Sequence, residues 1–225
     1  TENGTYDAEV TSASAFALTS KAVTIGTNPY AAYANYRSIG GISAASSASY
    51  GETLGTTYSV TMWAKNPTYG FIRTTNQDTH TAPWHTHDVL RWNGGKVSHI
   101  TWASNNSSGI TYNTNLNATS KSEWHFYGFK FQGTSSELHL DGAAPISGTT
   151  GLTGSSQDRV RLHEPAHFEN GERLAEFAIY NRALTDAEFV SIYNNGKPNG
   201  PDNVSSGRVS WFKCLSGAMG TNSGS

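Results

Sequence analysis

The sequence carries little charge and has a single cysteine. Lys and Arg number 15 and Asp and Glu 17, so charged residues make up only 14% of the 225-residue chain. No basic block appears, and the electrostatic footprint of a nucleic-acid-binding protein is therefore missing. The single cysteine, Cys214, excludes an intramolecular disulfide framework. Its apolar neighbours predict a small packed side chain rather than a reactive thiol.

Long hydrophobic runs are also lacking. No stretch approaches the roughly 18 apolar residues that a membrane span needs, and no secretory-signal pattern opens the chain. Because the sequence begins at Thr1 rather than Met, we expect that a leader or upstream domain has been removed or that the sequence is a segment of something longer. Because charged residues are few, Ser, Thr, Asn and Gly must make up most of the solvent-exposed surface. That composition suits an all-β protein located outside the cell or on a virion surface.

Residues 123–142 give the strongest hairpin signal. The aromatic run from Trp124 to Phe131 and the segment 137–140 predict two strands joined by a short polar turn. Asp141-Gly142 closes this unit with the dipeptide that most favours a tight turn. The aromatic run places bulky groups on both faces of its strand, and we favour burial on both sides over an open ligand groove.

Residues 173–189 predict a strand that runs directly into a short helix. Thr185 and Glu188 have the Thr-x-x-Glu spacing of a capping box. Phe189, Ile192 and Tyr193 fall on one helical face, and Gly196 is expected to end the helix. Further strands are expected at residues 21–25, 30–36, 58–65, 71–74, 89–92, 97–102, 159–162 and 207–215, with a long rim loop over 40–55.

The hairpin and the strand–helix unit together resemble the laminin-G-like, concanavalin-A-like jelly-roll superfamily. The resemblance rests on Trp124-His125, on Asp141-Gly142 and on the Glu-hydrophobic-x-Ile-Tyr-Asn-Arg-Ala-Leu-x-x-Ala-Glu pattern of residues 176–188. It spans roughly residues 57–215, and the hydrophobic-Trp segment near the end is similar to phage-encoded members. The resemblance implies an all-β fold, a two-sheet antiparallel β-sandwich (jelly roll) with one short helix near residues 185–195.

We expect one jelly-roll domain over residues 21–216. A polar lead-in or arm, residues 1–20, precedes it, and a flexible tail, residues 217–225, follows it. No internal repeat and no second-domain boundary is visible in the sequence.

A histidine-rich loop, residues 76–88, is the segment that we predict to bind a ligand. A flat indole ring matches the C–H face of a pyranose, while nearby polar groups bind its hydroxyls. Two imidazoles and a carboxylate could instead hold a transition metal, and an ordinary polar loop is the third reading. We favour sugar contact over metal. The predicted ligand-binding residues are Asp78, His80, Trp84, His85 and His87.

The resemblance also implies calcium at the rim, because many members of the superfamily bind it there. Calcium takes six to eight oxygen ligands, so one carboxylate with carbonyls and waters is sufficient. Ala175 stands where the superfamily usually has an Asp ahead of Glu176, which removes one common acidic position. The remaining candidate ligands are Asp78, Asp158, Glu169 and Asn170.

Residues 163–167 match the His-Glu-x-x-His signature of zinc proteases. That mechanism needs His163 and His167 on one helical face, with Glu164 polarising a metal-bound water. Pro165 lies inside the required helix, where it removes a backbone donor and clashes with the preceding turn. A strand end with two surface histidines is the favoured reading.

Hydrolytic chemistry has little support elsewhere in the chain. Glycoside hydrolases of this fold carry closely spaced carboxylates on one strand, and retaining chemistry needs two carboxyl groups about 5 Å apart. No such cluster, no Gly-x-Ser-x-Gly elbow and no phosphate-binding Gly-x-x-x-x-Gly-Lys loop occurs in the sequence.

We therefore expect a non-catalytic, lectin-like module that binds a glycan or cell-surface ligand through rim loops, with calcium as a possible cofactor. The alternative is a structural or adhesive virion protein, such as a phage decoration or fibre component, whose partners are other virion or surface proteins. A zinc hydrolase at residues 163–167 is the third hypothesis. Fold resemblance alone does not separate the first two.

Overall fold

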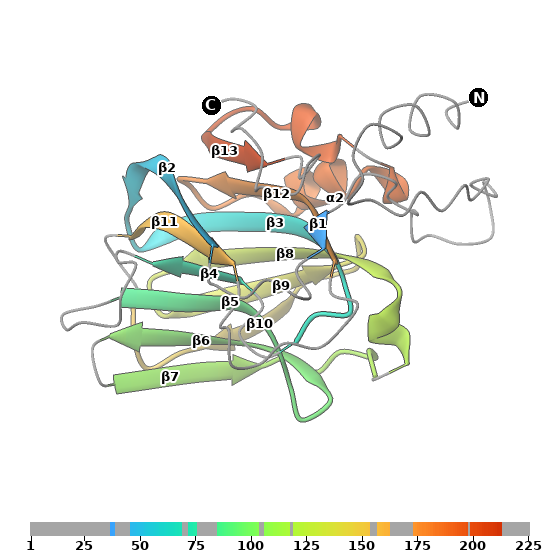
Figure 1. Ribbon diagram of the computed structural model, residues 1–225, viewed down its shortest axis with the longest axis horizontal. Coiled ribbons are helices and arrows are strands. Elements are labelled where there is room, and N and C mark those ends of the chain that lie inside the picture. The colour runs from blue at the N-terminus through green and yellow to red at the C-terminus, as the bar shows by residue number, and fades with distance from the viewer. Residues whose placement is uncertain are drawn as a thin grey trace.

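The computed structural model describes residues 37–38, 46–68, 72–75, 85–103, 106–117, 119–153, 157–162, 173–197 and 199–212. Over these ranges the chain forms two antiparallel sheets that make a sandwich (Figure 1). The predicted all-β architecture with a short helix near residues 185–195 is confirmed. Among the described helices, none is long and apolar enough to cross a membrane.

The larger sheet has seven strands in the order β1-β12-β3-β8-β9-β10, with β13 paired to β12 beside this path. Its central strands are long and rich in β-branched and aromatic residues, which favour a pleated surface buried on both sides. The strands are β1 (Arg37–Ser38), β3 (Thr57–Lys65), β8 (Trp124–Gln132), β9 (Ser135–Leu140), β10 (Ile146–Thr149), β12 (Arg173–Tyr180) and β13 (Arg208–Phe212).

The second sheet has six strands in the order β2-β11-β4-β5-β6-β7, and lies toward the viewer in Figure 1. Gly94 and Gly95, both with positive φ, form the tight turn between β5 and β6. The strands are β2 (Ser46–Leu54), β4 (Ile72–Thr75), β5 (His85–Asn93), β6 (Lys96–Ala103), β7 (Asn106–Thr111) and β11 (Gln157–Leu162).

The space between the sheets holds the main apolar core. Alternate residues of β3, from Tyr58 to Ala64, and of β8, from Tyr127 to Phe131, point into it. Val89 and Val97 enter it from the six-stranded sheet. These side chains are essentially inaccessible to solvent, and their burial is the main favourable contribution to folding.

A second apolar layer covers the opposite face of the seven-stranded sheet. Trp63, Phe126 and Trp211 project from the sheet into this layer. Phe189 and Ile192 meet them from helix α2 (Asp186–Tyr193). The helix is followed by two short 3₁₀ turns, η3 (Asn194–Gly196) and η4 (Gly200–Asn203), while a third, η1 (Ser120–Ser122), precedes β8. Strand β8 is thus buried on both faces, as its aromatic pattern predicts.

The strands predicted within the described residues are confirmed, but the loop predicted over residues 40–55 is wrong and some strands were not predicted. A rim loop was expected there, but β2 occupies Ser46–Leu54 and pairs with β11. Its Ser- and Ala-rich sequence lacks hydrophobic alternation, so its strand conformation depends on pairing with a neighbour. Strands β7 and β10 were missed for the same reason. The expected strands at 21–25 and 30–36, the segments 1–20 and 217–225, and Cys214 lie outside the described residues.

The Trp-His and Asp-Gly elements of the hairpin contact each other in the structure. Asp141 lies at a positive φ of 51°, in the turn position expected of it. One oxygen of its carboxylate accepts the Phe126 backbone N–H at 2.8 Å, and the other lies 2.6 Å from Nδ1 of His125. The Trp-His and Asp-Gly pair of the sequence is therefore a cross-strand contact that joins the end of β9 to the start of β8.

The helix begins as the capping box predicts. The Thr185 side chain accepts the Glu188 N–H, and the Glu188 carboxylate accepts the Thr185 N–H at 2.8 Å. Arg182 donates two further hydrogen bonds to the same carboxylate, at 2.6 and 2.9 Å. The helix ends earlier than the predicted Gly196, because Asn194 already takes the left-handed conformation that stops helices. Phe189, Ile192 and Tyr193 are all buried, as their spacing predicts.

We predict that Gly128→Ala destabilises the protein by about 1–3 kcal/mol, the usual cost of overpacking a filled core. A Cβ at Gly128 would lie 2.5 Å from the Phe189 ring and 3.3 Å from the Cβ of His139. The free energy of unfolding in urea measures the effect. Gly55→Ala is the matched control, because a Cβ there meets nothing within 4 Å. Equal stability of the two variants would contradict this packing.

We predict that stability falls between about pH 4.5 and pH 2 through Glu188. The Arg182 hydrogen bonds, with help from Thr185, lower the pKa of Glu188 from 4.5 to about 2. A lowered folded-state pKa stabilises the protein above the unfolded pKa, and this contribution is lost as the pH falls through the folded one. Glu188→Gln should flatten the pH dependence of unfolding in that window. The exposed Glu123→Gln should leave it as in the wild type.

Candidate functional site

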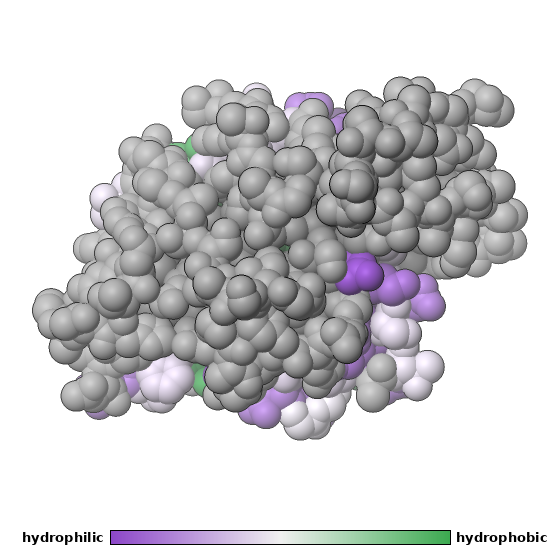
Figure 2. Space-filling model, in the orientation of Figure 1, coloured by the Kyte–Doolittle hydropathy of each residue, from purple (hydrophilic) through white to green (hydrophobic). Residues whose placement is uncertain are grey.

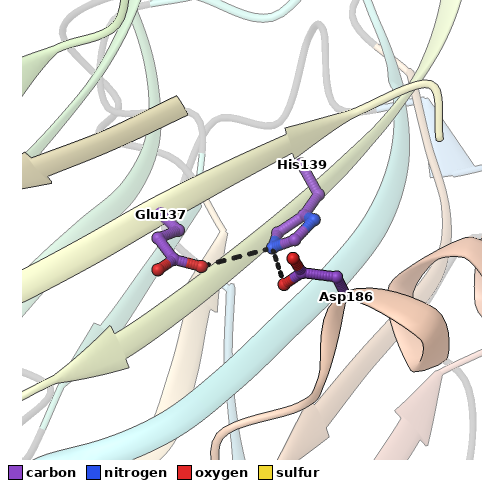
Figure 3. Close-up of side chains that lie close together, drawn as sticks. All are labelled: Glu137, His139 and Asp186. Carbon is purple, nitrogen blue, oxygen red and sulfur yellow. Dashed lines mark ion pairs between the residues drawn. The ribbon is translucent and has the colours of Figure 1, made fainter. Parts of the chain in front are cut away.

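A compact cluster of charged side chains lies where helix α2 begins to cover the seven-stranded sheet (Figure 3). Lys130 of β8 and Glu137 of β9 are directly opposite in the strand register. His139 follows two residues later on the same face of β9, opposite Gly128. Asp186 comes from the first turn of α2. Three elements therefore place these groups together. We call Lys130, Glu137, His139 and Asp186 the β9–α2 cluster.

The donor atoms of the β9–α2 cluster converge. His139 Nε2 lies 3.7 Å from Glu137 Oε2 and 3.8 Å from Asp186 Oδ1. The ligand atoms of these three residues all lie within 4.8 Å of one another. The Lys130 ammonium forms an ion pair with Glu137 and lies 3.5 Å from Asp186. A single positive charge is thus shared between two carboxylates beside an imidazole.

Packing fixes the His139 ring. It stacks on Phe189 with a centroid separation of 3.9 Å and an interplanar angle of 16°, and the residue is only 2% exposed. The glycine opposite it leaves room for this stack. Burial lowers the pKa of His139, against an opposing effect of the Asp186 carboxylate, and Lys130 lowers it further. Its Nε2 has no hydrogen-bond partner and points between the two carboxylates.

The β9–α2 cluster is suited to holding a cation rather than to hydrolysis. The two carboxylates are near the separation of about 5 Å that retaining glycosidases use. However, the Lys130 ammonium interacts with both of them. In the described geometry the two carboxylates are therefore already paired with a cation.

A second polar surface lies on the outer face of the six-stranded sheet. Val97 and His99 of β6 point into the core, so Ile100 and Trp102 project outward. Both outward side chains are partly exposed. The register places Trp102 opposite Ser107 and Ile100 opposite Gly109 of β7. We call Ile100, Trp102, Ser107, Gly109 and Thr111 the β6–β7 strip.

Of the predicted loop residues, His87 has a described side chain, and it lies in the core. It is 2% exposed, hydrogen-bonds through Nδ1 to the Tyr58 hydroxyl, and packs against Phe131 and His99. The alternation of β5 points it between the sheets, so in this arrangement it does not reach a ligand at the surface. Burial also lowers the pKa of His99 to about 3, which keeps that neighbouring ring uncharged.

The other predicted site residues stay predictions. Asp78, His80, Trp84, Glu169, Asn170 and the motif at 163–167 lie outside the described residues. His85 and Asp158 belong to β5 and β11, but only their backbone is described. Asp158 lies at a register shift between β11 and β2.

Sequence reasoning missed both the β9–α2 cluster and the β6–β7 strip. Glu137 and His139 alternate on one strand, which is a weak signal because charged residues commonly face solvent there. Asp186 was interpreted only as part of the helix start. Its approach to β9 depends on how α2 packs, and no local pattern records that packing.

The comparisons with known proteins concern the fold. No family model matches the sequence, and no curated protein matches it. Among solved structures, it is similar to a heptameric SAP-like pentraxin from Limulus polyphemus (11% identity, TM-score 0.47), covering 74% of this chain and 82% of that one. It is also similar to mouse laminin α1 domains LG4-5 (13%, TM-score 0.49), covering 72% of this chain and 46% of that one.

A third similar structure is domain 4 of a GH43 extracellular arabinanase from Geobacillus stearothermophilus, in complex with arabinotriose. The identity is 17%, the TM-score 0.41, and the match covers 64% of this chain and 68% of that one. The chain spans less than half of the laminin fragment. At these identities and TM-scores the matches do not determine what the chain binds.

We predict opposite pKa shifts of His139 in two charge variants. The Lys130 ammonium lowers this pKa and the Asp186 carboxylate raises it. Lys130→Met should therefore raise the pKa of His139, and Asp186→Asn should lower it. An NMR titration of the His139 ring proton measures both shifts. Shifts of the same sign in the two variants would contradict the described geometry.

Proposed function

We propose that this chain is a non-catalytic recognition module that binds glycans, with the β6–β7 strip as part of its binding surface. The observation that carries the proposal is the partly exposed Trp102 ring on the outer face of a sheet, beside exposed hydroxyl-bearing residues of β7.

The chemistry of the β6–β7 strip suits a sugar. An indole face packs against the C–H groups of a pyranose ring, and the Ser107 and Thr111 hydroxyls can exchange hydrogen bonds with its hydroxyls. Gly109 carries no side chain, and a Cβ there would lie 2.8 Å from Cγ1 of Ile100. The Ile100 side chain therefore lies over this glycine and extends the apolar surface beside the indole.

The register connects the strip with the predicted ligand loop. His85, the first residue of β5, pairs with Ala103, and Thr86 pairs with Trp102. The described start of β5 thus lies at the end of the sheet where Trp102 lies. The proposal includes a joint surface in which Trp84 and the strip contact one ligand. Calcium at Asp78, Asp158, Glu169 and Asn170 belongs to the same proposal.

Surface character favours recognition over assembly. Within the described residues, Val190 at 49% is the one large hydrophobic side chain classed as exposed. Among the described residues visible in Figure 2, hydrophilic and intermediate colours prevail, and hydrophobic residues show only in small areas. Permanent assemblies usually bury larger apolar surfaces. Our proposal that the protein acts outside the cell or on a virion surface rests on the low charge of the sequence and its abundance of Ser, Thr, Asn and Gly.

The test is a glycan array on the purified 225-residue chain, with calcium and again with EDTA. We expect saturable binding that Trp102→Ala reduces by about tenfold or more, which corresponds to about 1.4 kcal/mol of lost stacking. Trp84→Ala should weaken the binding of the same glycan. Val190→Ala is the control. This exposed residue belongs to α2, which covers the seven-stranded sheet, whereas the strip lies on the six-stranded sheet.

Binding that EDTA abolishes would support the calcium sites, and binding that survives EDTA would remove calcium from the proposal. Glycan binding that Trp102→Ala leaves unchanged would overturn the strip as the site. If the folded protein bound no glycan on the array, glycan recognition would be contradicted and the virion-assembly alternative would be favoured.

A further inference from the structure

We propose that Glu137, His139 and Asp186 form a binding site for a divalent transition metal ion such as Zn²⁺, and that Lys130 is the resident cation which the metal displaces. This site lies on the face of the seven-stranded sheet that packs against α2. It is separate from the β6–β7 strip, which belongs to the other sheet. The proposal therefore does not depend on glycan binding.

His139 is the residue that distinguishes this cluster from an ordinary surface ion pair. A buried imidazole nitrogen normally has a hydrogen-bond partner, because leaving one unsatisfied costs about 1–3 kcal/mol. Nε2 of His139 makes no hydrogen bond within 3.5 Å, although the residue is 2% exposed, and carboxylate oxygens of Glu137 and Asp186 lie at 3.7 and 3.8 Å from it. Stacking on Phe189 holds the ring so that this nitrogen points between the two carboxylates (Figure 3).

The spacing of the donors is close to that of a metal site. With bonds of about 2.1 Å, neighbouring ligands around a tetrahedral zinc ion are about 3.4 Å apart. The two distances from His139 Nε2 are 3.7 and 3.8 Å. The three ligand atoms lie within 4.8 Å of one another, so the two carboxylates would also have to approach each other around the ion. The Asp186 side chain is 62% exposed, so it has the freedom to make this adjustment.

The donor set indicates which metal would bind. One imidazole nitrogen and two carboxylates suit Zn²⁺, Co²⁺ or Mn²⁺. Calcium prefers six to eight oxygens and gains little from an imidazole. With three protein ligands, a tetrahedral ion would keep one position for water or for a group from a ligand.

Charge accounts for the role of Lys130. Two carboxylates with one ammonium leave a net negative charge, and a divalent ion in place of the ammonium would balance the site. The Lys130 head is on a flexible four-carbon stem and can move into solvent. The start of α2 contributes a partial positive charge that opposes any cation there. Competition from the Lys130 ammonium and the partial positive charge of the helix start both weaken metal binding. The first of these can be removed by mutating Lys130.

The experiment is a titration of the purified full chain with Co²⁺, followed by visible absorption, and with Zn²⁺, followed by calorimetry. We expect one ion bound at this site, with Lys130→Met binding about tenfold or more tightly, because a competing charge is gone. Glu137→Gln and His139→Gln should each lose this ion. The exposed Glu123→Gln is the matched control and should bind as the wild type does.

Asp186→Asn keeps the test valid if His139→Gln fails to fold, because this exposed side chain contributes nothing to the core. It should weaken Co²⁺ binding by about tenfold. The chain has eight histidines, so metal bound elsewhere would persist in all these variants. Binding that Asp186→Asn and Glu137→Gln leave unchanged would overturn the proposal. Failure of Lys130→Met to bind any tighter would overturn the displacement of the lysine.

Discussion

The structure depends on one constraint: the seven-stranded sheet is buried on both faces. Strand β8 packs Tyr127 and Phe129 against the six-stranded sheet and Phe126 against the helix layer. A sheet covered on both sides cannot show the simple alternation of polar and apolar residues. It needs a third layer, and α2 with its flanking 3₁₀ turns provides it. The position of the helix therefore follows from the apolar outer face of the sheet.

The β9–α2 cluster lies where this third layer ends. Phe189 of α2 stacks on His139 of β9, and Gly128 makes room for it. His139 is covered by that ring, whereas Asp186 is largely exposed. A buried imidazole and a half-solvated pair of carboxylates thus share one position.

Much of the fold was predictable because its signals are local. The capping box at Thr185 and Glu188, the Asp141-Gly142 turn and the alternation from Tyr58 to Ala64 each depend on residues close in sequence. The Ser- and Gly-rich strands β2, β7 and β10 were not predictable, because pairing with neighbours makes them strands. The sites were harder still. His87 has the sequence context of a loop residue, but the pleat of β5 turns it inward. Asp186 meets β9 only through tertiary packing.

The central claim is that the polar outer face of the six-stranded sheet recognises a glycan. The most direct measurement is NMR mapping of backbone amide shifts in ¹⁵N-labelled protein during titration with a glycan that it binds. The account predicts shifts concentrated in β6 and β7 and at the start of β5, with those of α2 unchanged. Shifts centred on α2 and β9, or spread evenly over both sheets, would contradict it.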